Sequence, residues 1–123
     1  MVSLRVAIAE DSWVMRDLLK RQLGVVIGLE IVGIAENGIE ALDITTECDP
    51  DVLILDISMP ILGGIDVLKR LRERASSPVV IMFTAETSLA VQNVCLEAGA
   101  DFFVGKTQLN RVVDICRQRM LMT

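Results

Sequence analysis

The chain has 123 residues, which is the size of one domain. Hydrophobic residues make up 52% of it, enough to bury a core, and 17 acidic against 12 basic residues give a net charge of −5. This negative charge argues against direct nucleic-acid binding. No apolar run is long enough for a membrane span. The chain has no histidine, which excludes histidine-based catalysis and histidine metal ligands.

The beginning of the chain has no signal-peptide pattern. Cys48, Cys95 and Cys116 are far apart and match no metal-binding spacing. We therefore expect a cytoplasmic protein with reduced thiols, in which residues 1–123 form a single domain.

Apolar runs of strand length alternate with helix-period segments along the whole chain. Strands are expected at residues 4–9, 30–35, 52–55, 79–83 and 102–104. These runs are rich in Val and Ile and apolar on both faces, which is typical of parallel strands covered by helices on both sides.

The segments between the strands are amphipathic. The expected core positions are Val14, Met15, Leu18 and Leu19 in the first helix, Gly64, Val67, Leu68 and Leu71 in the third, Val91, Val94, Cys95 and Ala98 in the fourth, and Leu109, Val112, Val113, Cys116 and Met120 in the fifth. Asn37 with Glu40 is typical of a capping box, and Thr87 and Thr107 are expected to cap the fourth and fifth helices. The alternation predicts an α/β fold with a doubly wound parallel sheet.

Acidic residues stand at the ends of two of these strands. Glu10 and Asp11 follow the first strand, and Asp56 follows the third. Ligands of doubly wound sheets bind beyond the carboxyl ends of the strands, so the three carboxylates converge if these strands are neighbours. Oxygen ligands favour Mg²⁺ or Mn²⁺ over zinc. With Lys106 after the fifth strand and Thr84 after the fourth, this edge holds the groups needed to move a phosphoryl group onto a carboxylate.

At these positions the sequence resembles the receiver domain of bacterial two-component response regulators, the chemotaxis regulators among them. The motifs that match are Glu10 with Asp11, Asp56 within DISMP, Gly64, Thr84 with Ala85, and Lys106 after AGADFFVG. They keep the family's order from about residue 4 to about residue 121. The resemblance implies a flavodoxin-like fold with five parallel strands in the order 2-1-3-4-5.

The resemblance also implies a phosphorylation site. Asp56 would accept a phosphoryl group from a sensor histidine kinase or a phosphotransfer protein. Glu10, Asp11, Asp56 and the main-chain carbonyl of Ser58 would hold Mg²⁺, with Mn²⁺ as the alternative ion. Lys106 would pair with the phosphoryl oxygens.

A conformational switch follows from the same resemblance. Thr84 would move to hydrogen-bond a phosphoryl oxygen, and the ring of Phe103 would move inward with it. The result is a signalling switch, not an enzyme with a separate substrate, whose surface on the fourth helix, fifth strand and fifth helix controls an output protein, an output domain or a homodimer. Leu89 and Leu96 lie opposite the core stripe of the fourth helix and are expected on that partner surface.

Trp13 is expected to be partly exposed near the metal site.

Four positions depart from the family pattern. Glu10 stands where Asp is commoner, Gly63 where Asp often precedes the loop glycine, Phe103 where Tyr is frequent, and Thr107 where Pro is usual. None of them removes a group needed for phosphotransfer. Without the proline, a cis bond before Thr107 would cost about 2.5–4 kcal/mol, so we do not expect one.

Three other functions remain as alternatives. One is a degenerate receiver that binds partners without being phosphorylated. Another is a metal-dependent phosphatase with an aspartyl-phosphate intermediate, although Ser58 stands where such enzymes usually carry a second acid. The third is a flavin carrier, in which Glu10 and Asp11 would repel the flavin phosphate.

Overall fold

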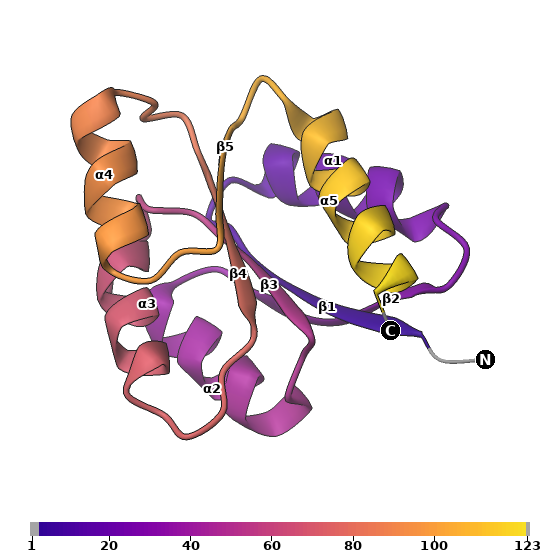
Figure 1. Ribbon diagram of the computed structural model, residues 1–123, viewed down its shortest axis with the longest axis horizontal. Coiled ribbons are helices and arrows are strands. Elements are labelled where there is room, and N and C mark those ends of the chain that lie inside the picture. Colours follow the sequence, from indigo (N-terminus) through magenta and orange to yellow (C-terminus); the bar gives the residue numbers. More distant parts are fainter. Residues whose placement is uncertain (1–2, 123) are drawn as a thin grey trace.

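The computed structural model describes residues 3–122, in which strands and helices alternate (Figure 1). The elements are β1 (Leu4–Ala9), α1 (Trp13–Gly24), β2 (Leu29–Ala35), α2 (Gly38–Cys48), β3 (Val52–Leu55), α3 (Gly64–Arg72), β4 (Val79–Thr84), α4 (Leu89–Glu97), β5 (Phe102–Gly105) and α5 (Leu109–Leu121). All strand pairs are parallel, and the order β2-β1-β3-β4-β5 confirms the predicted fold. None of the helices in this part of the chain is long and apolar enough to cross a membrane.

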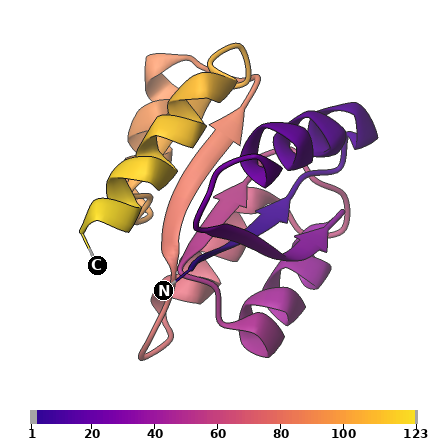
Figure 2. The same ribbon diagram turned by 90° about the vertical axis from the view of Figure 1, so that its right-hand side faces the viewer.

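Helices cover both faces of the sheet (Figures 1 and 2). α1 and α5 lie on one face, where Leu19 and Val112 are fully buried against Ile8 of β1. α2, α3 and α4 lie on the other face, where Leu68 of α3 packs with Ala9 of β1. Successive side chains of a strand point to opposite faces of the sheet, so one strand contributes residues to two separate cores.

The central strand β3 is the best-buried element of the sheet. Its four residues, with the sequence VLIL, are each at most 1% exposed. A strand covered on both sides has no polar face, which explains why this run shows no alternation of apolar and polar residues. Each such side chain contributes roughly 1.5–3 kcal/mol by leaving water. The residue that follows β3, Asp56, is thus positioned by a rigid strand.

The capping box at the start of α2 is confirmed. Asn37 Oδ1 accepts a hydrogen bond from Glu40 N at 2.9 Å, and Glu40 Oε1 accepts one from Glu36 N at 2.9 Å. Both bonds satisfy N–H groups that have no partner inside the helix.

The predicted caps of α4 and α5 are wrong by one residue. α4 is capped by Ser88, whose Oγ accepts from Val91 N at 3.3 Å, and α5 follows Gln108 without a side-chain cap. The reason lies in the preceding strands. β4 and β5 each extend one residue further than expected, which shifts both loops, so Thr87 and Thr107 lie before the caps.

The buried stripes of α1 and α4 are narrower than predicted. Val14 and Leu18 of α1 are 49% and 42% exposed, and Val94 of α4 is 46% exposed. In α1 the fully buried residues are Leu19 and Leu23, which are four positions apart. Residues four positions apart lie on the same face of a helix, so α1 buries one narrow stripe against the sheet.

Arg72 of α3 forms hydrogen bonds at the edge of the sheet where the strands begin, opposite their carboxyl ends. Its Nε donates to Gly99 O, its Nη1 to Pro78 O and its Nη2 to Asp101 Oδ2, each at 2.8 Å. Asp101 Oδ2 also accepts from Val80 N at 2.8 Å. The guanidinium thus joins the end of α3 to the beginnings of β4 and β5.

Candidate functional site

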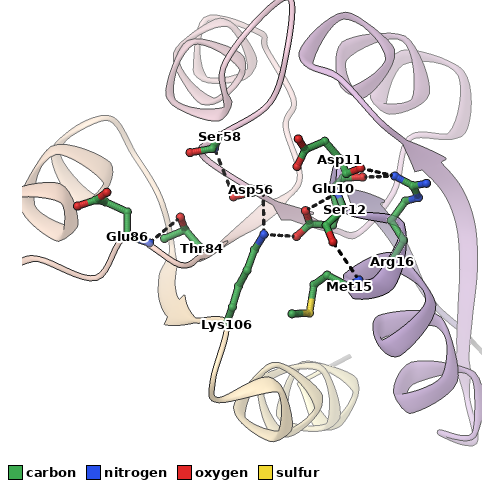
Figure 3. A network of polar contacts seen from close by, with 10 residues as sticks. All are labelled: Glu10, Asp11, Ser12, Met15, Arg16, Asp56, Ser58, Thr84, Glu86 and Lys106. Carbon is green, nitrogen blue, oxygen red and sulfur yellow. Dashed lines mark hydrogen bonds and ion pairs between the residues drawn. The ribbon is translucent and has the colours of Figure 1, made fainter.

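Three carboxylates meet at the carboxyl ends of β1 and β3 (Figure 3). These strands are neighbours, with Ala9 paired to Leu55, so the residues that follow them lie at the same edge. One oxygen from each of Glu10, Asp11 and Asp56 lies within 4.8 Å of the others. Glu10 and Asp56 are only 1% and 2% exposed, whereas Asp11 is exposed.

Lys106 lies between two of these carboxylates (Figure 3). Its Nζ is 2.8 Å from Glu10 Oε1 and 3.0 Å from Asp56 Oδ2. Burial opposes the charge of this ammonium, but the hydrogen bonds and charges of Glu10 and Asp56 outweigh burial and raise the pKa of Lys106. Every peptide bond within residues 3–122 is trans, including the bond before Thr107.

Glu10 is the most perturbed acid of the site. Burial raises its pKa to about 7, against the opposing hydrogen bonds from Lys106 and from Ser12 N. Its Oε2 accepts from Ser12 N at 3.0 Å. Glu10 Oε1 forms an ion pair with the Lys106 ammonium, but among the described residues no donor makes a hydrogen bond to it with good geometry. Within residues 3–122, Glu10 Oε1 is therefore a buried carboxylate oxygen without a hydrogen bond of good geometry, and such an oxygen is well suited to bind a metal cation in addition to the Lys106 ammonium.

The donor set fits a hard divalent cation. The side chains of Glu10, Asp11 and Asp56 offer only oxygen atoms, and their geometry brings one from each within reach of a single ion. Hard cations such as Mg²⁺ prefer this type of ligand. Ser58, whose carbonyl is the fourth predicted ligand, is two residues beyond Asp56 and donates its N–H to Asp56 Oδ1 at 3.3 Å.

The predicted switch residues lie on β4 and β5. Thr84 is 1% exposed, and its Oγ1 accepts from Glu86 N at 3.2 Å (Figure 3). Phe103 is half-buried, and Arg111 of α5 donates to its carbonyl at 3.3 Å. A cavity of about 340 Å³ is lined by Phe103, Thr87, Gln92, Gly105, Thr107, Gln108 and Arg111.

The apolar residues predicted to be exposed are exposed. Leu89 and Leu96 of α4 are 71% and 50% exposed, and Trp13 at the start of α1 is 69% exposed. Their roles as a partner surface and as a neighbour of the metal site stay predictions.

Arg16 is a part of the site that we did not predict. Its Nη1 donates to the main-chain carbonyls of Glu10 and Asp11, at 2.9 Å each, and its Nη2 lies 2.9 Å from Glu36 Oε1. It therefore fixes the backbone of two acids (Figure 3). The sequence carries no signal for this role, because a basic residue in the first turns of a helix usually faces solvent.

The backbone behind Asp56 is crowded. A Cβ at Gly64 would clash with the carbonyl oxygen of Asp56, and Gly64 N donates to Ile57 O at 2.8 Å. In the same loop Ile61 has a φ of 71°, an unusual value for a β-branched residue. Such strain is commonly found at functional sites.

Comparisons with known proteins agree with this geometry. The family model described as the response regulator receiver domain matches residues 6–117. A curated relative, the protein-glutamate methylesterase/protein-glutamine glutaminase 5 of Myxococcus xanthus, is 41% identical over 106 residues, or 84% of this chain. The chain spans only 30% of the length of that relative.

Solved structures show the same fold. The response regulator domain of Thermotoga maritima CheB has a TM-score of 0.87 and 31% identity, with 94% of this chain and 95% of that one covered. The CheX-CheY-BeF3-Mg+2 complex from Borrelia burgdorferi has a TM-score of 0.81 and 29% identity, with 93% of this chain and 90% of that one covered. The chain therefore belongs to the family of response regulator receiver domains.

Proposed function

We propose that residues 1–123 form one receiver domain that accepts a phosphoryl group on Asp56 and thereby controls an output partner. The supporting observation is the convergence of Asp56 with Glu10, Asp11 and Lys106 at one edge of the sheet. The proposed donor is a sensor histidine kinase or a phosphotransfer protein, which places the reaction in the cytoplasm. The net charge of −5 disfavours direct nucleic-acid binding by this domain.

In the proposed reaction, a carboxylate oxygen of Asp56 attacks the phosphorus of the donor's phosphohistidine. A P–O bond forms while the P–N bond breaks, and the electron pair stays on the imidazole nitrogen. Asp56 is 2% exposed, so few water molecules need to leave it. The Lys106 ammonium, 3.0 Å from Asp56 Oδ2, is in position to balance negative charge on the phosphoryl oxygens.

The acidic cluster needs positive charge for this reaction. Two carboxylates about 4 Å apart repel each other by about 4 kcal/mol at an effective dielectric constant near 20. Glu10, Asp11, Asp56 and the main-chain carbonyl of Ser58 would hold Mg²⁺, or Mn²⁺ as the alternative. Bound there, the ion would supply charge that stabilises the phosphoryl oxygens in the transition state. The Borrelia burgdorferi complex, which contains BeF3 and Mg+2, supports this choice.

The proposed output is a change of surface. Thr84 would leave Glu86 N and donate to a phosphoryl oxygen, and Phe103 would turn inward beside it. Added negative charge and acceptor oxygens are sufficient to bias such a two-state surface. The partner, which is an output protein, an output domain or a second copy of the chain, would contact α4, β5 and α5, including Leu89 and Leu96.

Phosphorylation of the intact protein tests this function. After incubation with Mg²⁺ and acetyl phosphate, the wild-type mass should increase by one phosphoryl group, and Asp56→Asn should show no increase. Asp66→Asn, which removes an exposed acid on α3, is the matched control and should be phosphorylated like the wild type. A folded wild-type protein that gains no mass would contradict the proposal and favour an unphosphorylated interaction module.

A further inference from the structure

Arg16 binds three successive main-chain carbonyls where β1 leads into α1 (Figure 3). Its Nη1 donates to the carbonyls of Glu10 and Asp11 at 2.9 Å each, and its backbone N donates to the carbonyl of Ser12 at 2.9 Å. We propose that Arg16, held by Glu36, is a positioning residue for the divalent cation, because it fixes the backbone from which two of the carboxylate ligands project. This inference rests on the proposed function, since it requires a divalent cation at the acidic cluster.

The bend of the backbone at residues 10 and 11 is what brings two neighbouring acids to one place. In an extended strand, successive side chains point to opposite faces, so two adjacent carboxylates would diverge. Here one oxygen from each of Glu10 and Asp11 lies within 4.8 Å of the other. Their two carbonyls accept from the same nitrogen of Arg16, which holds the chain in the bent form. The guanidinium therefore acts on the carboxylates through the main chain.

Glu36 orients the guanidinium from the other side. Its Oε1 lies 2.9 Å from Arg16 Nη2, which leaves Nη1 for the two carbonyls. The side chain of Arg16 is 16% exposed and that of Glu36 is 62% exposed. An ion pair with so exposed a partner adds little to stability, so its effect lies in orientation. Only a planar fork with several donors serves all these acceptors at once, which a lysine ammonium cannot reproduce.

The residue that holds Arg16 is itself fixed at the start of α2. Glu36 N donates to Glu40 Oε1 at 2.9 Å in the capping box. Two residues further on, a Cβ at Gly38 would clash with the carbonyl oxygen of Leu62, so the start of α2 packs directly against the loop after β3. The pair of Arg16 and Glu36 thus joins the loop after β1 to a junction that contacts the loop carrying the phosphoacceptor.

The charge of Arg16 and its positioning role predict opposite effects on metal binding. By Coulomb's law alone, removing a positive charge close to a cation site should tighten the binding of Mg²⁺. Removing a group that orients the ligands should weaken it, and partners of this kind typically change metal affinity 10- to 100-fold. The sign of the effect therefore separates the two.

Mg²⁺ affinity of the intact protein tests the role of Arg16. The probe is Mg²⁺ alone, measured by calorimetry under conditions in which circular dichroism shows each variant to be folded. Arg16→Met should weaken binding about tenfold, and Arg16→Lys should weaken it at least about threefold although it keeps the charge. Arg21→Met removes the same charge from an exposed position of α1 and should stay within about twofold of the wild type. Unchanged or tighter binding in Arg16→Met would overturn the inference.

Two variants of Glu36 give a second test that does not depend on the folding of the Arg16 variants. Glu36→Ala and Glu36→Gln remove the same charge from an exposed side chain, but only glutamine keeps an oxygen that accepts from Arg16 Nη2. Glu36→Ala should bind Mg²⁺ about threefold more weakly than Glu36→Gln. In the Arg16→Met background the two should bind equally, because residue 36 then has no guanidinium to orient. Equal affinities in the wild-type background would contradict the role of Glu36.

The two proposals fail in different ways. A wild-type protein that binds Mg²⁺ and is phosphorylated on Asp56, with unchanged affinity in the Arg16 and Glu36 variants, overturns this inference only. A wild-type protein that neither binds Mg²⁺ nor becomes phosphorylated overturns the proposed function as well.

Discussion

Among single residues, Gly64 has the most direct effect on the position of Asp56. The start of α3 lies against the carbonyl of Asp56 so closely that only a hydrogen atom fits at the Gly64 side-chain position. The main chain of Asp56, the proposed phosphoacceptor, is therefore packed against the start of α3, and its carboxylate is paired with Lys106.

Substituting Gly64 by alanine should separate α3 from Asp56. The added methyl group meets the backbone of Asp56, which cannot move aside as a flexible side chain would. We expect Gly64→Ala to lower the free energy of unfolding by about 2 kcal/mol and to slow phosphorylation by acetyl phosphate. Gly24→Ala is the matched control, because a Cβ there meets nothing within 4 Å, and it should be neutral or slightly stabilising. Urea unfolding measures both changes, and equal effects of the two substitutions would contradict the expectation.

The buried Glu10 should make stability depend on pH. In the folded, metal-free protein its pKa is raised to about 7 by burial, whereas the unfolded chain releases the proton near 4.5. Between these values the folded state binds more protons, so the free energy of unfolding contributed by this group falls as the pH rises. We expect thermal unfolding in EDTA to show this fall between pH 5 and pH 7 and Glu10→Gln to flatten it.

The exposed acid Asp66 again provides the comparison for this pH effect. Asp66→Asn should keep the wild-type slope. A Glu10→Gln protein with an unchanged slope would mean that Glu10 ionises in the folded state as it does in water.

At the level of secondary-structure elements, the two edges of the sheet are held by different interactions. The edge with Asp56 is held by ion pairs among acids and Lys106, which a metal ion or a phosphoryl group would rearrange. The opposite edge is held by Arg72, whose partners are mainly backbone carbonyls and Asp101. The bonds of Arg72 do not depend on any ligand of the proposed site.

Removing the Arg72 side chain should destabilise the fold without affecting phosphotransfer. Arg72→Ala leaves the carbonyls of Gly99 and Pro78 and the carboxylate of Asp101 without this donor, and we expect a loss of about 2 kcal/mol in the free energy of unfolding. Arg72→Lys should recover little, since an ammonium lacks the planar fork that reaches several acceptors.

The neighbouring Arg70 is exposed on the same helix and offers the control. Arg70→Ala should change stability by less than about 0.5 kcal/mol. If Arg72→Ala were equally mild in denaturant titrations, the bonds at this edge would not contribute to stability. The level of phosphorylation should be the same in both variants at a temperature where both are folded.

For the whole molecule, the parallel topology determines where chemistry can occur. All five strands point the same way, so every carboxyl end lies at one edge, and the residues after β1, β3, β4 and β5 meet there. Residues far apart in the sequence thus form one site. A ligand at this site stabilises the folded chain as a whole, because the unfolded chain cannot bind it in the same way.

Mg²⁺ should therefore raise the melting temperature. At about 100 times its Kd, a ligand that binds only the folded state adds about 2.7 kcal/mol. Asp11→Asn should reduce this gain with little effect on the metal-free protein, because Asp11 is exposed and its side chain lies outside the core. Differential scanning fluorimetry at constant ionic strength measures the shift. An equal shift in Asp11→Asn would argue against its proposed role as a ligand.

The fold and the edge that carries the site were predictable because they depend on patterns that run along the sequence. The unbroken apolar run of β3 indicates a central parallel strand, and Asp56 directly after it marks the carboxyl end. The contact between Glu10 and Lys106 was not predictable, since it depends on the reach of two long side chains across the sheet. The same applies to Arg16 and Arg72, because an arginine side chain can satisfy many different partners and the sequence does not say which.

The position of Trp13 has a practical consequence. The chain contains one tryptophan and no tyrosine, so its intrinsic emission comes almost entirely from this indole. Trp13 is 69% exposed and is only two residues from Asp11, at the point where α1 begins. Its emission should therefore respond when Mg²⁺ and a phosphate mimic bind, and an unchanged spectrum would place the indole out of range. The protein thus carries its own optical probe, and binding at the acidic cluster can be followed without a label.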